Sequence, residues 1–312
     1  VAVSTLAAGS TFVAGESVSG TAAFTGTLTL SGELIVGRAF SAPGAGASAA
    51  GTVTAGTLTT QAPQFPPGFA FWSIGVGSGG SGTGAVTAAS VDTSAQALAA
   101  LNVGSANQGG TGIGSLSVGS GDLDVANTVF VGVASGQSGV AAEGTLGLGG
   151  TLSAEGTNRF LRIGAVVGDF SDAGAGSAVG SIEAGGIAGF RFVTIGTSSL
   201  YDGAVDPVTG APLVTASGIA TVGAGGIVNA TDSGGTLQIG LATGQAVNNT
   251  LIGPGAAVTG SAAVGGDISG YAIVDIGRVV HTGEASGSLD LANGTLTTET
   301  LRIGTVQGSN GQ

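Results

Sequence analysis

The chain has 312 residues, of which 64 are glycine, with no cysteine, no methionine and a formal net charge of −12. The lack of cysteine excludes a disulfide framework and a thiolate metal site, and six arginines without any lysine exclude the clustered cations of a nucleic-acid-binding protein. No apolar run approaches the roughly 18 residues that a membrane-spanning helix needs. Because position 1 is not methionine, we expect a processed or truncated start, with removal of a signal peptide as the plain explanation.

One short motif recurs along the whole chain: an apolar residue, a variable residue, isoleucine or valine, and glycine. Alternation of fixed apolar and variable positions predicts a half-buried strand. Recurrence at a period of tens of residues predicts a solenoid. The nine copies are Leu34–Gly37, Trp72–Gly75, Leu101–Gly104, Val129–Gly132, Leu161–Gly164, Val193–Gly196, Leu237–Gly240, Val274–Gly277 and Leu301–Gly304.

Two further strands are expected before each copy. The first follows a glycine and carries two apolar residues at alternate positions, and these glycines are 20, 51, 84, 114, 144, 180, 218, 260 and 287. The second is expected to centre on Leu28, Leu58, Val91, Leu123, Leu152, Ile187, Val228, Ile268 and Leu296, with Ile227 as the alternative to Val228. Each unit is therefore predicted to contain three short strands separated by turns.

This unit predicts an all-β fold: a right-handed parallel β-helix with three short strands per coil. The whole of 1–312 is expected to form a single β-solenoid domain, with a partial N-terminal coil at 1–19, nine coils over 20–304 and a C-terminal tail at 305–312. Thr11–Gly15 is expected to supply the third strand of the partial coil. One buried ladder is predicted from Val36, Ile74, Val103, Val131, Ile163, Ile195, Ile239, Ile276 and Ile303.

The longest loops are expected at Ser198–Ser217 and Leu241–Thr259, projecting from one edge. Exposed loops carry function in solenoids more often than the ladders do. If the protein binds a ligand, the loop aromatics and their neighbours, around Phe65, Trp72, Tyr201 and Tyr271, would form the groove.

The run from Gly287 to Gly304, with Gly294-Thr295-Leu296-Thr297 at its centre, resembles the β-strand repeats of bacterial autotransporter passengers and related large surface proteins. The resemblance covers nearly the whole chain. It implies a secreted β-helix at the surface of a bacterium, acting in adhesion or as structural fibre. It transfers no catalytic residue, and these residues contain no outer-membrane barrel segment.

Catalytic and cofactor signals are sparse. His281 is the sole histidine, and we expect it to be solvated. Asp92 and Asp124 occupy equivalent positions in adjacent units and are expected to stack about 5 Å apart. Asp122 lies beside them, so Ca²⁺ is the one cofactor considered, against the alternative of a solvated acidic patch. Otherwise no cofactor and no enzymatic activity are expected.

The favoured hypothesis is a subunit of an extracellular fibre that assembles head to tail with copies of itself. Phe12 and Val13 at one end and Leu301 and Ile303 at the other are the predicted interface, because both end coils present unpaired strand edges. A segment cut from a longer solenoid would show the same open ends. The alternative function is an adhesin that binds a glycan or a host surface through its long loops.

Overall fold

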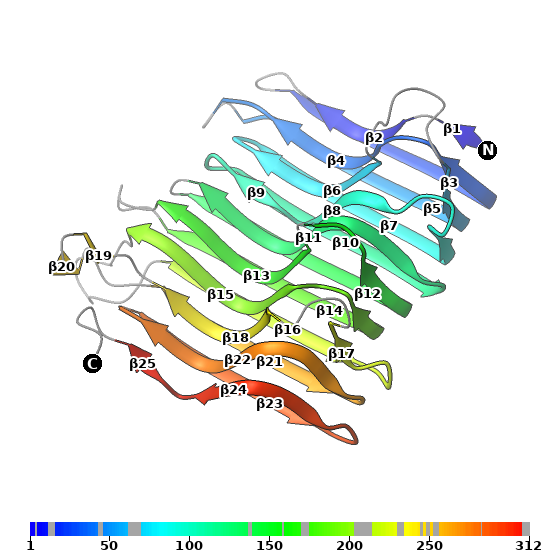
Figure 1. The fold of residues 1–312 in the computed structure, drawn as a ribbon. Coiled ribbons are helices and arrows are strands. Elements are labelled where there is room, and N and C mark those ends of the chain that lie inside the picture. Colours follow the sequence, from blue (N-terminus) through cyan, green and yellow to red (C-terminus); the bar gives the residue numbers. More distant parts are fainter. Residues whose placement is uncertain are drawn as a thin grey trace.

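The computed structural model describes residues 1–3, 5–11, 16–42, 46–61, 70–136, 139–157, 159–169, 175–202, 214–229, 234–243, 246–247, 250–251, 256–281 and 283–307. These residues form strands that stack as parallel coils along one axis (Figure 1). The parallel β-helix predicted from the repeat is thus the observed fold, while its right-handed winding stays a prediction. The described residues contain no helix that could cross a bilayer.

The first strand of each coil pairs in parallel with the first strand of the next coil. The starting glycines keep one register, as Gly51 pairs with Gly84 and Gly84 with Gly114. These nine strands are β3 (Ser17–Leu30), β5 (Ser48–Thr60), β7 (Ser81–Asp92), β10 (Thr111–Ser120), β12 (Val140–Ala154), β14 (Gly176–Ala188), β16 (Val214–Val222), β21 (Ala257–Val264) and β23 (Glu284–Leu291).

The third strands form a second parallel row, which we call the third-strand face. Val131 pairs with Ile163, and Ile163 with Ile195, as the motif predicts. The row consists of β2 (Leu6–Thr11), β4 (Leu34–Phe40), β6 (Phe71–Ser78), β8 (Leu98–Val103), β11 (Leu123–Gly136), β13 (Phe160–Asp169), β15 (Phe192–Asp202), β18 (Gly235–Thr243), β22 (Ile268–Val280) and β24 (Leu296–Ile303).

The second strands are less separate than the sequence suggests. In β3 and β12 the chain runs from the first segment into the second through a register shift rather than a turn. Ile227, not Val228, is the centre of its second strand, because it pairs with both Ile187 and Ile268. The remaining short strands are β1 (Ala2–Val3), β9 (Ala106–Asn107), β17 (Ile227–Val228), β25 (Val306–Gln307) and the antiparallel pair β19 (Ala246–Val247) and β20 (Thr250–Leu251).

The partial N-terminal coil differs from the prediction. Its third strand is β2, in which Leu6 pairs with Leu34 and Ala8 with Val36. Leu6-Ala7-Ala8-Gly9 is therefore a tenth copy of the motif, with alanine in place of isoleucine or valine. Gly9 has the same positive φ as the other motif glycines. Most of the predicted strand at Thr11–Gly15, including Phe12 and Val13, lies outside the described residues.

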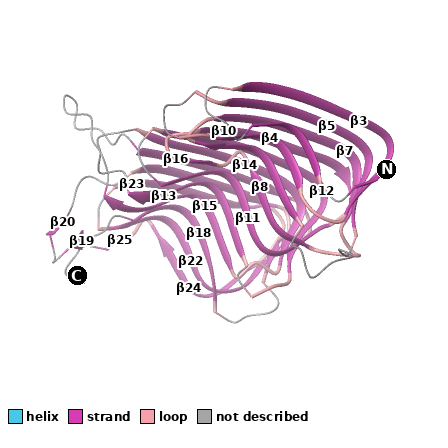
Figure 2. Cartoon of the chain, turned by 90° about the horizontal axis from the view of Figure 1, so that it is seen from above, coloured by secondary structure: helices cyan, strands magenta, loops and turns pink. Residues whose placement is uncertain are grey.

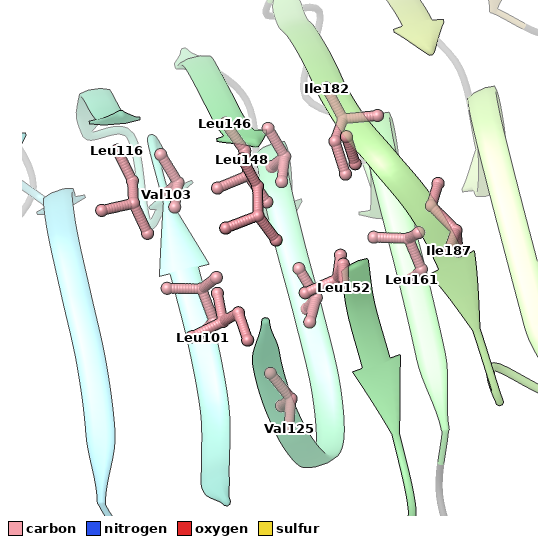
Figure 3. Close-up of a cluster of buried hydrophobic side chains, with 14 of the residues drawn as sticks. Leu101, Val103, Leu116, Val125, Leu146, Leu148, Leu152, Leu161, Ile182 and Ile187 are labelled. Carbon is pink, nitrogen blue, oxygen red and sulfur yellow. The ribbon is translucent and has the colours of Figure 1, made fainter. Parts of the chain in front are cut away.

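The main core lies between the three strands of each coil. Leu146 and Leu152 of β12 and Leu161 of β13 point into this interior, together with their equivalents in neighbouring coils (Figure 3). Eight members of the predicted ladder, from Val36 to Ile276, are at most 7% exposed. The ninth, Ile303, is 64% exposed, because no further coil covers it in the described chain.

A second, thinner core lies beyond the motif glycines, because the third strands continue past them. In β13 the ladder resumes directly after Gly164, where Ala165 pairs with Thr197 and Val166 with Ser198. The small side chains of these extensions pack against the N-terminal halves of the first strands, as Ala134 and Val166 do with Ala142 and Ala178. In the view from above, the strands form stacked rows with connections at their ends (Figure 2).

The extensions correct the predicted loops. Ser198–Asp202 belongs to β15, and Val214–Ser217 belongs to β16, so only 203–213 remain between them, outside the described residues. Likewise β18 runs to Thr243 and β21 begins at Ala257. Because the sequence pattern stops at Ile-Gly, it gives no sign of these strand extensions.

Two rows of glycine separate the cores, and we call this region the glycine waist. The motif glycines have φ near +60°, for example +59° at Gly164. A Cβ on Gly164 would lie 1.7 Å from the carbonyl oxygen of Ser217, and one on Gly218 would lie 2.2 Å from the nitrogen of Gly196. The first and third strands therefore touch backbone to backbone, where no side chain fits.

Two glycines of β12 allow a test of the glycine waist, because one lies in the waist and the other lies outside it. We expect Gly144→Ala to lower the free energy of unfolding by about 3 kcal/mol or more, because overpacking a filled site forces the backbone to move. Its Cβ would lie 2.2 Å from the nitrogen of Gly132. Gly147→Ala is the matched control, since the nearest atom to its Cβ would be the Ser117 hydroxyl at 3.9 Å. Denaturant unfolding of both variants measures the difference, and equal stabilities would contradict the waist.

Candidate functional site

A groove follows the outer side of the third-strand face. The strands bend at the motif glycines, so residues before and after each bend face one another across a shallow hollow. One hollow of about 360 Å³ is lined by Arg38, Phe71, Asn107 and Phe130 among others. A second of about 270 Å³ is lined by Phe160, Arg162, Phe192 and Thr243 among others. Together they span strands of the first seven coils.

Phenylalanine and arginine side chains stack along one wall of this groove. The rings of Phe160 and Phe192 lie 4.8 Å apart and nearly parallel, at 14°, because the two residues are register partners in β13 and β15. The guanidinium of Arg162 lies 5.7 Å from the ring centre of Phe130 and 5.8 Å from that of Phe160. Arg191 lies 5.1 Å from the ring centre of Phe192. Contacts of this kind are favourable cation–π interactions.

The arginine side chains are concentrated on the third-strand face. All six arginines of the sequence lie within a third strand or one or two residues before it: Arg38, Arg159, Arg162, Arg191, Arg278 and Arg302. Burial lowers the pKa of Arg162 from its ordinary value, since it disfavours the charged form. The pKa of Arg38 is lowered for the same reason and partly restored by the charge of Glu33.

The arginines differ in whether a carboxylate of the protein lies close enough to neutralise their charge. Asp275, 1% exposed, lies 3.0 Å from Arg278 and 3.4 Å from Arg302. These two arginines therefore share one buried carboxylate. Within the described part of the chain, no carboxylate lies within ion-pair distance of Arg162. The middle of the groove thus holds a cation whose contacts are aromatic.

Several polar atoms in the groove lack hydrogen-bond partners among the described residues. They are the hydroxyl oxygens of Ser105 and Thr194 and the side-chain oxygen of Asn107, and all three are shielded from solvent. Ser105 and Asn107 line the first hollow and Thr194 the second. Buried polar groups are normally paired, so these atoms mark places where a bound group can complete the hydrogen bonding.

The ninth coil is the second candidate site. Leu301 is 45% exposed, Ile303 64% and Val306 73%, whereas the residue equivalent to Ile303 in the preceding coil, Ile276, is 7% exposed. A Cβ on Gly304 would meet nothing within 4 Å, so the waist is also uncovered here. Of the predicted interface residues, Leu301 and Ile303 therefore lie on an exposed apolar end, while Phe12 and Val13 lie outside the described residues.

Asp92 and Asp124 are not register partners in the described strands, because Asp92 pairs with Thr59 and Asp124 with Ser153. The backbone nitrogen of Asp124 donates to the Thr93 hydroxyl at 2.7 Å, so Thr93 takes the place expected for Asp92. Asp92 instead accepts from the nitrogen and hydroxyl of Ser94, and these bonds lower its pKa. Asp122 accepts from the nitrogen of Thr151 at 2.7 Å. The described residues contain no group of three acidic, histidine or cysteine side chains that could hold a metal ion.

Two of the four aromatic residues named from the sequence are buried rather than exposed at the surface. Trp72 is 0% exposed and Tyr271 2% exposed, and the Tyr271 hydroxyl donates to the carbonyl of Phe190 at 3.0 Å. Burial raises the pKa of that hydroxyl. Phe65 and the side chain of Tyr201 lie outside the described structure. His281 was expected to be solvated, yet its Nδ1 is buried and has no partner among the described residues.

Comparison of the chain with protein-family models, with curated proteins and with solved structures finds no match. Residue roles at the groove and at the ninth coil therefore rest on geometry and chemistry.

Acid should weaken the last coils through Asp267. Its carboxylate accepts from the nitrogen and the hydroxyl of Thr295 at 2.8 and 2.9 Å, which lowers its pKa below the ordinary 3.8. A lowered pKa gives stability that is present above the ordinary value and is lost as pH falls through the lowered one. We expect Asp267→Asn to reduce the melting temperature at pH 7, and this deficit to shrink below pH 3.8.

The control for this prediction is Asp290→Asn, which alters an exposed carboxylate of β23 with no hydrogen-bond partner among the described residues. Thermal melts by circular dichroism at several pH values give the comparison. A deficit for Asp267→Asn that stays constant with pH would contradict the role of the charge.

Proposed function

We propose that this chain is a structural segment of an extracellular bacterial fibre, in which solenoids of the same sequence stack end to end. The observation that carries the proposal is the uncovered ninth coil, with its row of exposed apolar side chains. Leu301 and Ile303 hold the positions that are buried in every preceding coil from Leu34 and Val36 onward. A further coil of the same kind would bury them in the same way.

The two ends of the described solenoid are unlike but complementary. All coils are joined by parallel pairing. The free edge of β24 at one end is therefore opposite in kind to the free edges at the other end, which belong to β2 and to the part of β3 that is not paired with β1. A contact between unlike surfaces on copies of one chain is heterologous and continues without closing. Such a contact produces filaments rather than closed dimers.

The energy for stacking comes from apolar burial and strand pairing. Full burial of one leucine or isoleucine side chain contributes roughly 1.5–3 kcal/mol. Leu301, Ile303 and Val306 are all available at this end.

The extracellular bacterial setting and the lack of catalysis are part of the proposal. They are supported by the resemblance of the repeats to bacterial surface proteins and by the scarcity of catalytic side chains in the sequence. The alternative of an adhesin acting through long loops stays a prediction, since 203–213 lie outside the described residues.

Assembly is measured by sedimentation velocity and negative-stain electron microscopy of the purified chain. We expect filaments for the natural sequence and monomers for Leu301→Lys combined with Ile303→Lys, because charge on an edge strand opposes pairing. Ile219→Lys is the matched control, since Ile219 is similarly exposed, at 51%, but lies on the side of the solenoid in β16.

Filaments that survive Ile219→Lys and disappear with the double lysine variant support the proposal. A natural chain that stays monomeric at high concentration would overturn it. Loss of assembly in the Ile219→Lys variant would also overturn the proposal, because the contact between copies would then lie on the side of the solenoid.

A further inference from the structure

We propose that the groove on the third-strand face binds an acidic polysaccharide, which lies along the solenoid axis with Arg162 as its central cation. This site is independent of end-to-end stacking. It also differs from the loop-borne glycan site expected from the sequence, because its residues lie on strands.

The wall of phenyl rings suits a sugar chain. Phe160 and Phe192 are stacked face to face, so the half-exposed pair presents its ring edges as a strip of apolar surface along the groove. A pyranose ring has an apolar face of C–H groups that fits such a surface. The opposite wall carries hydroxyl groups, including those of Ser199 and Thr243, which can donate and accept hydrogen bonds with sugar hydroxyls. The hollow thus combines apolar and polar groups, which match the two kinds of surface on a sugar.

The arginines select for negative charge. The ring centres of Phe130 and Phe160 lie 5.7 and 5.8 Å from the Arg162 guanidinium, and Arg162 lines the second hollow, so its N–H edges can face a ligand there. Those edges match a carboxylate or sulfate in a two-bond arrangement. Because no carboxylate of the described protein lies within ion-pair distance of Arg162, a ligand can supply the missing charge. The partnerless hydroxyl of Thr194 lies in the same hollow.

The ligand is expected to be long and of low charge density. The two hollows follow one another along the axis, and Phe130 lines the first while stacking on Arg162, which lines the second. Arg38 in the first hollow lies four coils from Arg162, or about 19 Å at about 4.8 Å per coil. Cations this sparse fit a polymer with well-separated acidic groups. Nucleic acid carries a charge at every phosphate, so the net charge of −12 would repel it more strongly than a polymer with few acidic groups.

The test is isothermal titration calorimetry with an oligogalacturonate that is long enough to span the groove and largely methyl-esterified, so that its free carboxylates are well separated, and with the same oligosaccharide after complete esterification. We expect the natural chain to bind the acidic form at least about tenfold more tightly than the complete ester, which equals about 1.4 kcal/mol. Arg162→Gln should remove that preference, and Phe160→Ala should weaken both forms. Circular dichroism melts confirm that each variant is folded.

The matched control is Arg302→Gln, which removes one arginine from the same face but outside both hollows. It should leave the affinity within about twofold. Equal losses for Arg162→Gln and Arg302→Gln would overturn the site, as would equal binding of acid and ester. Tighter binding of single-stranded DNA than of oligogalacturonate at the same ionic strength would identify a nucleic-acid surface instead. Failure of these tests leaves the fibre proposal unaffected, because that proposal rests on Leu301 and Ile303.

Discussion

The backbone contact between two rows of glycine is the constraint on which the rest of this solenoid depends. Because Gly164 lies against Ser217 and Gly218 across the interior, the first and third strands cannot separate to admit side chains at that level. The interior is thereby divided into a main core of leucine, isoleucine and valine and a second core of mostly alanine and valine. The motif glycines from Gly9 to Gly240 each contact the first strand two coils further on, so the waist also ties successive coils together. The high glycine content follows largely from this arrangement and from the corners.

The same bend that forms the waist also shapes the outer surface. A strand that turns at a residue with φ near +60° becomes concave on its outer side, and the third-strand face carries its groove there.

The thin interior has room for few large side chains. Trp72 and Phe190 are fully buried within the main core, whereas Phe130, Phe160 and Phe192 lie half-buried on the outside. Their rings are covered mainly by one another and by arginine, which leaves one edge of each stack for solvent or a ligand.

Much of the fold could be predicted from the repeat, because buried positions must recur in every coil. The pairing of Val131, Ile163 and Ile195 follows directly from the motif. The tenth copy at Leu6–Gly9 was missed because Ala8 is smaller than the expected isoleucine or valine. The strand extensions were missed because alanine and serine after the glycine give no clear alternation. The groove was missed for a different reason: the motif treats the position of Phe130 and Arg162 as variable, and a repeat pattern carries no information about such positions.

Motif positions that are the same in every coil and motif positions that vary form two different kinds of surface on this chain. Positions that are the same in every coil can only recognise another coil, so the exposed Leu301 and Ile303 are suited to a copy of the chain or to a further repeat. Positions that change from coil to coil give each part of the third-strand face its own chemistry, so Phe130, Arg162 and Thr194 form a sequence-specific set although they share one register. A ligand bound there would therefore have a fixed place along the axis, while stacking at the ends would leave that face open. Because the two surfaces use different residues, a fibre built from such coils would carry its binding groove once per subunit, at a spacing set by the length of the chain.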